Sequence, residues 1–380
     1  MNPESPNASG TPPDAEPPSR QLQQYREEID RIDRDVVALL NERAKIAQSV
    51  GHVKSGANSA VFAPDREEQV YANIRAANMG PLPSEALKAI YREVISGMRA
   101  LEQHLTVAFL GPVHTFTHQA ALSRFGSSSQ FLAARTVAEV FALAEKGTAD
   151  YSVVPIENST GGGVPDTLDL FVNSDLQVCA EIMLPIHHHL ISASDLGLIR
   201  HVYSHPQSFA QCRHWLAIHL PGVDLIEASS NSRAVEQASE DAASAAIGPD
   251  IAARAHGLKI LASNIEDSPI NVTRFLVLGK HIGRRSGRDK TAVLFSIRDR
   301  VGALRDALDV FERHSINLTK IESRPSRRKV WDYIFFVDFV GHPDDHHVTA
   351  ALDALREQCV HVKVLGAWPQ AELAAPGPGF

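Results

Sequence analysis

Ala149-Asp150-Tyr151-Ser152-Val153-Val154-Pro155 is echoed 94 residues later by Ala243-Ser244-Ala245-Ala246-Ile247-Gly248-Pro249. Both segments are short, mostly apolar runs that end at a proline. This pattern is typical of a buried strand followed by a turn. A weak repeat of this kind predicts two similar lobes, with a small-molecule site in the cleft between them.

Short apolar runs alternate with helical stretches on both sides of this repeat. Such alternation predicts α/β architecture for residues 106–281. The strands expected there, besides a run at 271–278, are 107–112, 151–156, 176–182, 201–204, 223–227 and 244–247.

Residues 21–104 have helical periodicity instead. Apolar residues recur at helical spacing from Gln21 to Val50 without Gly or Pro, which predicts a helix of about 30 residues, roughly 45 Å long. A helix of this length needs a partner along it. Pro64 suits the start of a second helix ending near Met79, and Ser84 suits the N-cap of a third helix ending near residue 104. We therefore expect an all-α three-helix unit.

The C-terminal part has a third pattern. After a basic, Gly-containing linker at 280–290, the order strand, helix, strand, strand, helix, strand predicts a ferredoxin-like (βαββαβ) domain at 290–368. Its expected elements are 291–297, 302–314, 318–323, 332–339, 347–358 and 361–365. The two ends, 1–20 and 369–380, are rich in Pro, Ala and Gly, and we expect them to be loose.

Composition excludes several classes of protein. A net charge of −8 argues against a nucleic-acid binder, and no apolar run is long enough for a membrane span. The three scattered cysteines predict neither disulfides nor zinc and suit a reducing cytosol, so the expected location is cytoplasmic. His187, His188 and His189 would alternate faces on a strand, so no metal site is expected. Gly161–Gly163 lacks the spacing of a nucleotide-binding loop.

Two cations on the long helix could form an anion site. Arg43 and Lys54 are eleven residues apart and share a face about 16 Å apart, so their long side chains could hold a small dianion between them. Arg26 lies seventeen residues before Arg43, too far to reach the same pocket along one straight helix. An antiparallel helix from a second subunit would supply it. The sequence thus predicts a dimer with shared sites.

The role of three further charged residues has two possible interpretations. Arg66 and Glu67 lie near the start of the second helix, and Glu102 lies at the edge of the apolar stripe on the third. Each is either a solvated residue at a helix edge or a group placed for function.

The helical part of the chain resembles the all-helical chorismate mutase family. The matching segments are Tyr25–Asp30, Leu39–Arg43, Val50–Lys54 and Pro64–Glu67. The resemblance implies that Arg26 of the partner, Arg43, Lys54 and Arg66 bind the two carboxylates and the ether oxygen of chorismate. It also implies that Glu67 accepts a hydrogen bond from the substrate hydroxyl and that a protonated Glu102 lies beside the ether oxygen. The rearrangement is pericyclic, so it requires positive charge and a folded substrate conformer but no nucleophile.

Polar clusters also follow the expected strands of the α/β part. Asn271-Val272-Thr273-Arg274-Phe275 carries a hydroxyl and a guanidinium within a strand-like run, and a strand arginine requires a carboxylate from the protein or a ligand. Thr273 could equally be an ordinary strand residue and Arg274 part of a surface ion pair. The other clusters are 115–119, 157–160, 204–207 and 229–232.

Over residues 106–281, approximately, the chain resembles the prephenate dehydratase family. The resemblance is carried by these clusters and by the segments 109–112, 117–121, 154–159, 203–207 and 273–275. The resemblance implies an α/β bilobal fold like that of type II periplasmic binding proteins, with Thr273 as the catalytic hydroxyl. One departure is His114, where relatives usually have Gly. The residues implied to bind substrate are Thr117, Glu157, Asn158, Ser204, Gln207, Arg274 and Phe275.

The C-terminal domain resembles the ACT domain fused to prephenate dehydratases. Its Gly302-Ala303-Leu304 and Glu322-Ser323-Arg324-Pro325 segments imply phenylalanine binding at a subunit interface. A helix N-terminus at a glycine offers backbone donors to the carboxylate of an amino acid. The alternative is a dimerisation module without a ligand.

Together the three resemblances predict a bifunctional enzyme that converts chorismate to prephenate and prephenate to phenylpyruvate, with phenylalanine as a feedback effector. No cofactor is expected, and the predicted assembly is a homodimer or a higher homo-oligomer. A mutase fused to a dehydrogenase would need a dinucleotide fingerprint, which is absent from the sequence. Two alternatives stay open: a dehydratase that acts on arogenate, and a regulatory protein that binds aromatic acids without turnover.

Overall fold

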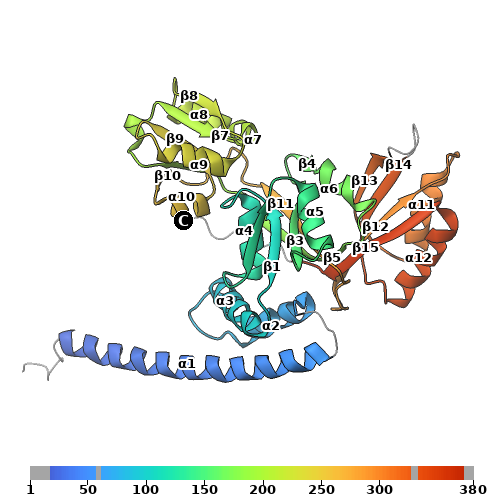
Figure 1. Cartoon of the computed structure of the whole chain (residues 1–380), viewed down its shortest axis with the longest axis horizontal. Helices are drawn as coiled ribbons and strands as arrows, with labels where there is room; N and C mark the ends of the chain where they lie inside the picture. Colours follow the sequence, from blue (N-terminus) through green and yellow to red (C-terminus); the bar gives the residue numbers. More distant parts are fainter. Residues whose placement is uncertain (1–17, 57–60, 327–332, 372–380) are drawn as a thin grey trace, which may run out of the picture. The chain divides into compact units, whose positions relative to one another are not determined.

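A computed structural model describes residues 18–56, 61–326 and 333–371 of the chain (Figure 1). The chain divides into two compact units, 1–57 and 58–380. Within the described residues the first unit is a single helix, α1 (Pro18–Gly56), and all other helices and strands belong to the second unit. None of the helices described is long and apolar enough to cross a membrane.

Helix α1 is longer than predicted, with 39 residues and a length of about 58 Å. It begins at Pro18, so the expectation of a loose segment is wrong for residues 18–20, while residues 1–17 lie outside the described part. Proline suits a first helical position because its missing N–H would have no partner there. Large apolar side chains are exposed along α1: Leu22, Tyr25, Ile29, Ile32, Val36, Leu39, Ile46, Val50 and Val53.

Helices α2 (Pro64–Ala77) and α3 (Ser84–Glu102) lie close to the predicted ranges. The N-cap prediction is wrong, because Pro83 has the extended backbone of a cap and Ser84 is already helical. The predicted apolar stripe of α3 is also only partly right. Met98 is buried, but Leu101 is 55% exposed, and the buried polar side chain of Arg99 reaches the carbonyl oxygen of Phe125 on α4 (Phe116–Phe125).

Two lobes with the same strand arrangement follow, as the repeat predicted. The first lobe has the strand order β2 (Gln130–Ala134), β1 (Thr106–Leu110), β3 (Tyr151–Asn158), β11 (Val272–Gly279), β5 (Gln177–Pro185). The second has the order β8 (Asp224–Glu227), β7 (His201–Ser204), β9 (Ser244–Gly248), β6 (His189–Ser192), β10 (Lys259–Ala262). In each lobe the first two pairings are parallel and the last two are antiparallel. The two repeated segments form equivalent central strands, β3 and β9.

The first lobe contains β1 (Thr106–Leu110), α4, β2 (Gln130–Ala134), α5 (Val137–Glu145), β3 (Tyr151–Asn158), β4 (Gly162–Gly163), α6 (Pro165–Phe171), β5 (Gln177–Pro185) and β11 (Val272–Gly279). The second contains β6 (His189–Ser192), the 3-10 turn Leu196–Leu198, β7 (His201–Ser204), α7 (Pro206–Gln211), α8 (Arg213–His219), β8 (Asp224–Glu227), α9 (Asn231–Ser239), β9 (Ser244–Gly248), α10 (Asp250–His256) and β10 (Lys259–Ala262). The strands β2, β4, β6 and β10 were not predicted, and each of them has at most five residues.

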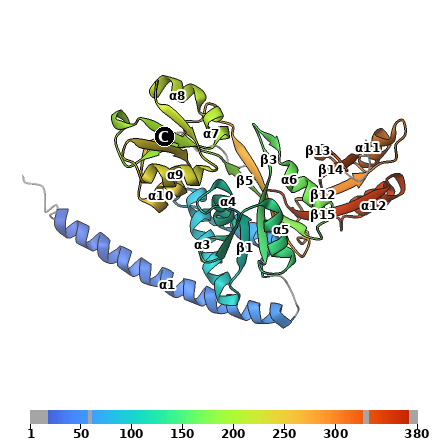
Figure 2. The same ribbon diagram turned by 45° about the horizontal axis from the view of Figure 1, so that its top comes forward.

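The C-terminal domain has the predicted βαββαβ order. Its elements are β12 (Asp289–Ser296), α11 (Ala303–Arg313), β13 (Leu318–Pro325), β14 (Tyr333–Val340), α12 (His346–Gln358) and β15 (His361–Pro369). The strand order is β13-β14-β12-β15. Both helices pack on one face of this sheet, where Phe311 of α11 and Leu352 of α12 share a core with Val293 of β12 (Figure 2). Pro369 ends β15, so the expectation of a loose tail is wrong there, and residues 372–380 lie outside the described part.

The C-terminal sheet continues into the first lobe. Strand β15 pairs with β5 through Gly366 and Val178, which joins both domains in one ten-stranded sheet. A Cβ at Gly366 would lie 2.1 Å from the carbonyl oxygen of Val178, so only glycine allows this approach. On the face opposite α11 and α12, Leu294 and Phe336 share one hydrophobic core with Leu276 of β11. The two domains therefore have a common core.

Candidate active sites and the domain seam

Thr273 and Asn158 form the polar centre of the predicted dehydratase site. They are paired directly across β11 and β3, and Asn158 Nδ2 donates to Thr273 Oγ1 at 2.9 Å. Asn158 Oδ1 accepts from the backbone N–H groups of Thr160 (3.0 Å) and Gly161 (2.8 Å), which fixes the orientation of the amide. Because the threonine oxygen accepts from this amide, its own proton is directed toward another acceptor. The arrangement leaves the Thr273 hydroxyl able to donate to an acceptor other than Asn158.

Strand alternation separates the three residues of the Thr273-Arg274-Phe275 segment. Phe275 is 2% exposed and packs with Phe125 of α4 and Phe109 of β1, so Thr273 lies on the same face of the sheet as α4. Arg274 points to the opposite face. The structure therefore does not bring the guanidinium of Arg274 together with the Thr273 hydroxyl, and Phe275 is a core residue.

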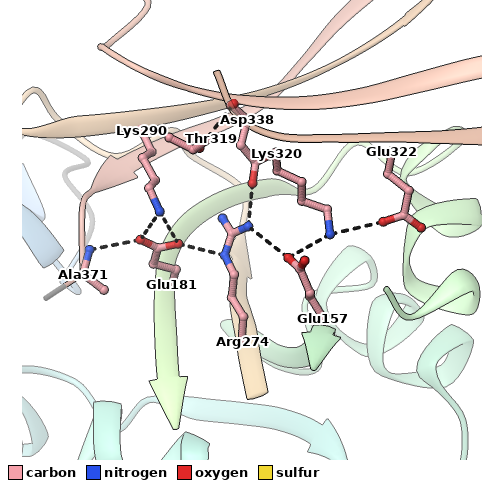
Figure 3. A network of polar contacts seen from close by, with 9 residues as sticks. All are labelled: Glu157, Glu181, Arg274, Lys290, Thr319, Lys320, Glu322, Asp338 and Ala371. Carbon is pink, nitrogen blue, oxygen red and sulfur yellow. Dashed lines mark hydrogen bonds and ion pairs between the residues drawn. The ribbon is translucent and has the colours of Figure 1, made fainter. Parts of the chain in front are cut away.

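Arg274 is held by carboxylates from both domains (Figure 3). Its Nε donates to Glu181 at 2.9 Å, and its Nη1 donates to Asp338 of β14 at 2.6 Å. Burial tends to lower the pKa of this guanidinium, but the charges of Asp338 and Glu181 outweigh burial and raise it above its usual range. The prediction of Arg274 as a substrate carboxylate anchor is at odds with this geometry, since the side chain is 10% exposed and already bound to two carboxylates.

Glu157 lies at the same interface between the first lobe and the C-terminal domain. Its carboxylate lies 2.9 Å from Lys320 Nζ of β13 and 4.0 Å from Arg274 Nη1. Lys320 also lies 3.2 Å from Glu322, and Glu181 accepts from Lys290 and from the backbone of Ala371. The result is a chain of alternating charges that joins β3, β5 and β11 to three strands of the C-terminal domain (Figure 3). No sequence motif pointed to Glu181, Lys290, Lys320 or Asp338.

The other residues predicted to bind substrate have varied surroundings. Thr117 is buried in the first turn of α4, on the Thr273 side of the sheet. Gln207 is exposed, and a Cβ at Gly161 would lie 3.2 Å from its Nε2, so this side chain of the second lobe approaches the turn that follows Asn158. Ser204, in contrast, is fully buried and donates to Asn231 at 3.2 Å. Ser204 thus shapes the β7–α7 loop, contrary to the prediction that it lines the site.

His114 stands where a glycine was expected from the resemblance. Its φ of 64° lies in the left-handed region, which glycine adopts without strain and other residues rarely adopt. Its backbone N–H donates to Nδ1 of His118, and the His118 ring stacks on Phe109. Burial, and then the charge of His114, lower the pKa of His118 to about 4. His118 is therefore a neutral acceptor that holds the strained turn at the start of α4.

The residues predicted for the mutase site are divided between the two compact units. Arg26, Arg43 and Lys54 are on α1, with Arg26 exposed. In the second unit Arg66 is exposed, whereas Glu67 is 6% exposed and pairs with Arg99 at 2.7 Å. This ion pair ties α2 to α3. The half-buried Glu102 is the last residue of α3.

The predicted effector segments occupy two elements of the C-terminal domain. Gly302 precedes α11 with a φ of 81°, a conformation that favours glycine, and Ala303 and Leu304 form the first turn. Glu322 and Arg324 lie on one side of β13, where Arg324 pairs with Asp169 of α6 at 3.2 Å. Ser323 and Pro325 alternate with them and are exposed.

The three consecutive histidines have separate partners, but only His189 lies in a strand, so the expectation that they alternate along a strand is wrong for His187 and His188. His187 Nδ1 lies 2.8 Å from Glu266, His188 Nε2 lies 2.8 Å from Gln211, and His189 Nδ1 accepts from the backbone of residue 264. Glu266 also accepts a hydrogen bond from the backbone N–H of His188, so it links the two chain segments that connect the lobes.

Three family models match the chain in succession. They are chorismate mutase type II over residues 25–103, prephenate dehydratase over 107–282 and the ACT domain over 291–357. The chain is 48% identical to a bifunctional chorismate mutase/prephenate dehydratase of Aquifex aeolicus (strain VF5), over 93% of this chain and 99% of that protein. The chain belongs to the bifunctional chorismate mutase/prephenate dehydratase family. The predicted family and fold classes are thus confirmed.

Two more relatives of this bifunctional enzyme are informative. The chain is 43% identical to a bifunctional chorismate mutase/prephenate dehydratase of Neisseria gonorrhoeae (strain ATCC 700825 / FA 1090), over 92% of this chain and 97% of that protein. Its fold is similar to a crystal structure of prephenate dehydratase from Arthrobacter aurescens in complex with L-Phe. That similarity has a TM-score of 0.65 and 34% identity, and it covers 72% of this chain and 93% of the other.

Proposed function

We propose that this chain rearranges chorismate to prephenate and then converts prephenate to phenylpyruvate, and that phenylalanine regulates it through the ACT domain. The observation that carries the proposal is the Asn158–Thr273 pair, which presents an oriented hydroxyl in a chain of this family. The product of the first reaction is the substrate of the second.

For the mutase reaction, Arg43 and Lys54 of α1 are the cations that bind the substrate in this proposal. Arg43 and Lys54 share a face of α1, and Arg66 lies in the first turn of α2. Positive charge beside the ether oxygen stabilises the transition state, in which the breaking C–O bond becomes electron-rich. Glu102, the last residue of α3, lies beside that oxygen in this proposal, as the resemblance implies.

A second copy of the chain supports the mutase site. Large apolar side chains are exposed along α1 over about 58 Å, and exposed apolar surface of this extent is typical of an interface. Pairing with an antiparallel α1 would cover this surface and would bring Arg26 of the partner subunit to the pocket of Arg43 and Lys54. The assembly is then a homodimer or a higher homo-oligomer.

For the dehydratase reaction, Thr273 assists the departing hydroxyl. The bond to the ring carboxylate breaks, its electron pair moves through the ring, and the ring C–O bond breaks, so carbon dioxide and hydroxide leave and the ring becomes aromatic. The hydroxide takes up a proton from solvent and becomes water. A hydrogen bond from Thr273 Oγ1 to the leaving oxygen stabilises the charge that develops there. Asn158 orients this hydroxyl, and Thr117, from the same side of the sheet, and Gln207, from the second lobe, complete the pocket.

Phenylalanine binds at the ACT domain, in part through the backbone donors at Gly302 and the start of α11. The exposed Ser323 and Pro325 belong to the same effector site, at an interface with another subunit. The expected location of the enzyme is the cytosol, where chorismate would be available and the three buried thiols would stay reduced.

The deciding experiment supplies chorismate to the purified chain and follows prephenate and phenylpyruvate, with and without phenylalanine. We expect prephenate to appear first, phenylpyruvate to follow, and phenylalanine to slow the second step. Parallel assays with prephenate and arogenate identify the substrate of the dehydratase site. Binding of these acids without turnover would instead identify a regulatory protein and contradict the proposal.

A further inference from the structure

Asn271 is the last residue of the chain segment that returns from the second lobe to β11 of the first lobe. Its carbonyl oxygen accepts a hydrogen bond from the backbone N–H of Ile186 at 2.7 Å. Ser159 holds the residues on both sides of it. The Ser159 hydroxyl donates to the carbonyl oxygen of Ile270 at 3.1 Å and accepts from the N–H of Val272 at 3.0 Å. The backbone of Asn271 is therefore fixed on the first lobe.

The side-chain oxygen of Asn271 is bound to the centre of the predicted dehydratase site. Nδ2 of Asn158 donates to Asn271 Oδ1 and to Thr273 Oγ1, each at 2.9 Å. An amide nitrogen has two protons, so these two acceptors use its whole donor capacity. Oδ1 of the same amide is held by the backbone N–H groups of Thr160 and Gly161. The plane of the Asn158 amide, and with it the direction of the bond to Thr273, thus depends on Asn271.

The side-chain nitrogen of Asn271, in contrast, is unfavourable for folding. Asn271 is 4% exposed, and within the described part of the chain its Nδ2 has no hydrogen-bond partner. A buried donor without a partner destabilises the folded state. Leucine has nearly the same shape and lacks this donor, so packing alone does not favour an amide here. What the amide adds is the oxygen that accepts from Asn158.

We propose that Asn271 is a positioning residue of the dehydratase site, which fixes the Asn158 amide and, through it, the hydroxyl of Thr273. In this role Asn271 does not touch the substrate, so it governs the rate of the chemical step and not the binding of prephenate. The inference rests on the proposed function, because it assigns a further residue to the same site.

The test replaces Asn271 by leucine in the full-length chain. One N–H of Asn158 then loses its acceptor, and the amide can turn away from Thr273. We expect kcat for prephenate to fall about tenfold, as for the loss of one hydrogen bond, with KM nearly unchanged. The unfolding midpoint should change little, because the variant loses one unpaired N–H at position 271 and gains one at Asn158. A native kcat, or a rise in KM alone, would contradict the inference.

Asn271→Asp separates the two ends of the side chain. This variant keeps an oxygen for Asn158 and removes the unpaired donor. At saturating prephenate its kcat should therefore lie much closer to that of the native chain than the kcat of Asn271→Leu. If both variants were equally slow, the acceptor would be unimportant and the positioning role would be wrong.

The matched control is Glu266→Ala. Glu266 lies in the same connecting segment, and its side chain is 5% exposed and bonds to His187 and to the backbone of His188. Its loss should lower the unfolding midpoint but leave kcat for prephenate unchanged, because no bond to Asn158 is altered. Equal falls in kcat for Glu266→Ala and Asn271→Leu would show that a loosened segment explains both, against the inference.

A double variant tests whether Asn271 acts through Asn158. In an Asn158→Ala background no amide remains to be oriented, so adding Asn271→Leu should change kcat by less than about twofold. A further fall of about tenfold would mean that Asn271 acts independently of Asn158, and the inference would fail.

A measurement without substrate separates this inference from the proposed function. In NMR hydrogen exchange both side-chain amide protons of Asn158 should exchange slowly in the native chain, and one should exchange faster in Asn271→Leu. Equal exchange in the two proteins would overturn the positioning role. If the exchange behaved as expected but the native chain did not turn over prephenate, the proposed function would be wrong instead.

Discussion

Oγ1 of Thr273 accepts a hydrogen bond from Nδ2 of Asn158 at 2.9 Å, and the direction of this bond defines the role of the threonine. The amide cannot be reversed without losing the backbone donors of Thr160 and Gly161. The hydroxyl proton of Thr273 is therefore directed away from this amide. A neutral threonine is a weak acid, so the contribution that we propose for it is a well-oriented hydrogen bond to the leaving oxygen.

Thr273→Val should abolish most dehydratase activity. Valine has nearly the same shape and keeps the strand packed, but it removes the donor, so we expect kcat for prephenate to fall about a hundredfold or more. With chorismate as substrate, prephenate should accumulate. Thr273→Ser should retain much of the activity. Simultaneous loss of both reactions in folded protein would contradict a two-site enzyme.

Asn158→Asp tests the orientation of the hydroxyl. The variant keeps an oxygen for the backbone of Thr160 and Gly161, but it replaces the donor beside Thr273 with an acceptor. Thr273 would then donate to the introduced carboxylate and no longer to substrate. We expect a fall in kcat of about a hundredfold with an unchanged thermal midpoint. An active Asn158→Asp enzyme would show that the direction of this bond is unimportant.

Lys54→Ala should have the opposite effect on the two reactions. Removing a cation from the predicted chorismate pocket should lower mutase kcat/KM by about a hundredfold or more, because less charge stabilises the transition state. Turnover of added prephenate should be unaffected. The control is Lys45→Ala, which removes an exposed lysine from the same helix and should leave both rates unchanged.

The buried imidazole of His118 predicts a specific pH dependence. Its folded pKa is about 4, against an ordinary value of 6.5, so the unfolded chain binds the proton more tightly. The stability contribution of this group is fully present above pH 6.5 and is lost as pH falls toward 4. NMR titration of the ring should give the low pKa directly. His118→Gln should flatten the fall of the unfolding midpoint over this range, and an ordinary pKa would contradict the role of a buried neutral acceptor.

Gly366→Ala should weaken the contact between β15 of the ACT domain and β5 of the first lobe. The added methyl group would lie 2.1 Å from the carbonyl oxygen of Val178, so β15 must move away from β5. Overpacking of this kind typically costs about 1–3 kcal/mol. Gly197→Ala is the control, because a Cβ there meets no atom within 4 Å. Calorimetric unfolding of both variants measures the difference.

The sequence predicted the three architectures because each has its own apolar period. The repeated segments at Tyr151 and Ser244 became equivalent strands, and the βαββαβ order of the last domain was correct. Short strands such as β2, with only one buried residue among five, lack an apolar pattern and were missed. Ser84 failed as a cap because the chain enters the helix one residue earlier, at Pro83.

Thr273 was singled out correctly as a polar strand residue beside Asn158 in space, but its relation to Arg274 was not foreseen. Neighbouring residues of a strand alternate between its faces, which could have placed these two residues on opposite sides of the sheet. The partners of Arg274 could not have been found this way. Asp338 is 64 residues away in another domain, and only the docking of the two sheets brings it close.

The shared sheet has a consequence for shortened forms of the chain. A protein ending before β12 would leave β5 as an open sheet edge and would uncover Leu276 and Leu278, which now pack with Leu294 and Phe336. Open edges and bare apolar faces promote aggregation. Removal of the C-terminal domain would therefore expose apolar side chains of the first lobe to solvent.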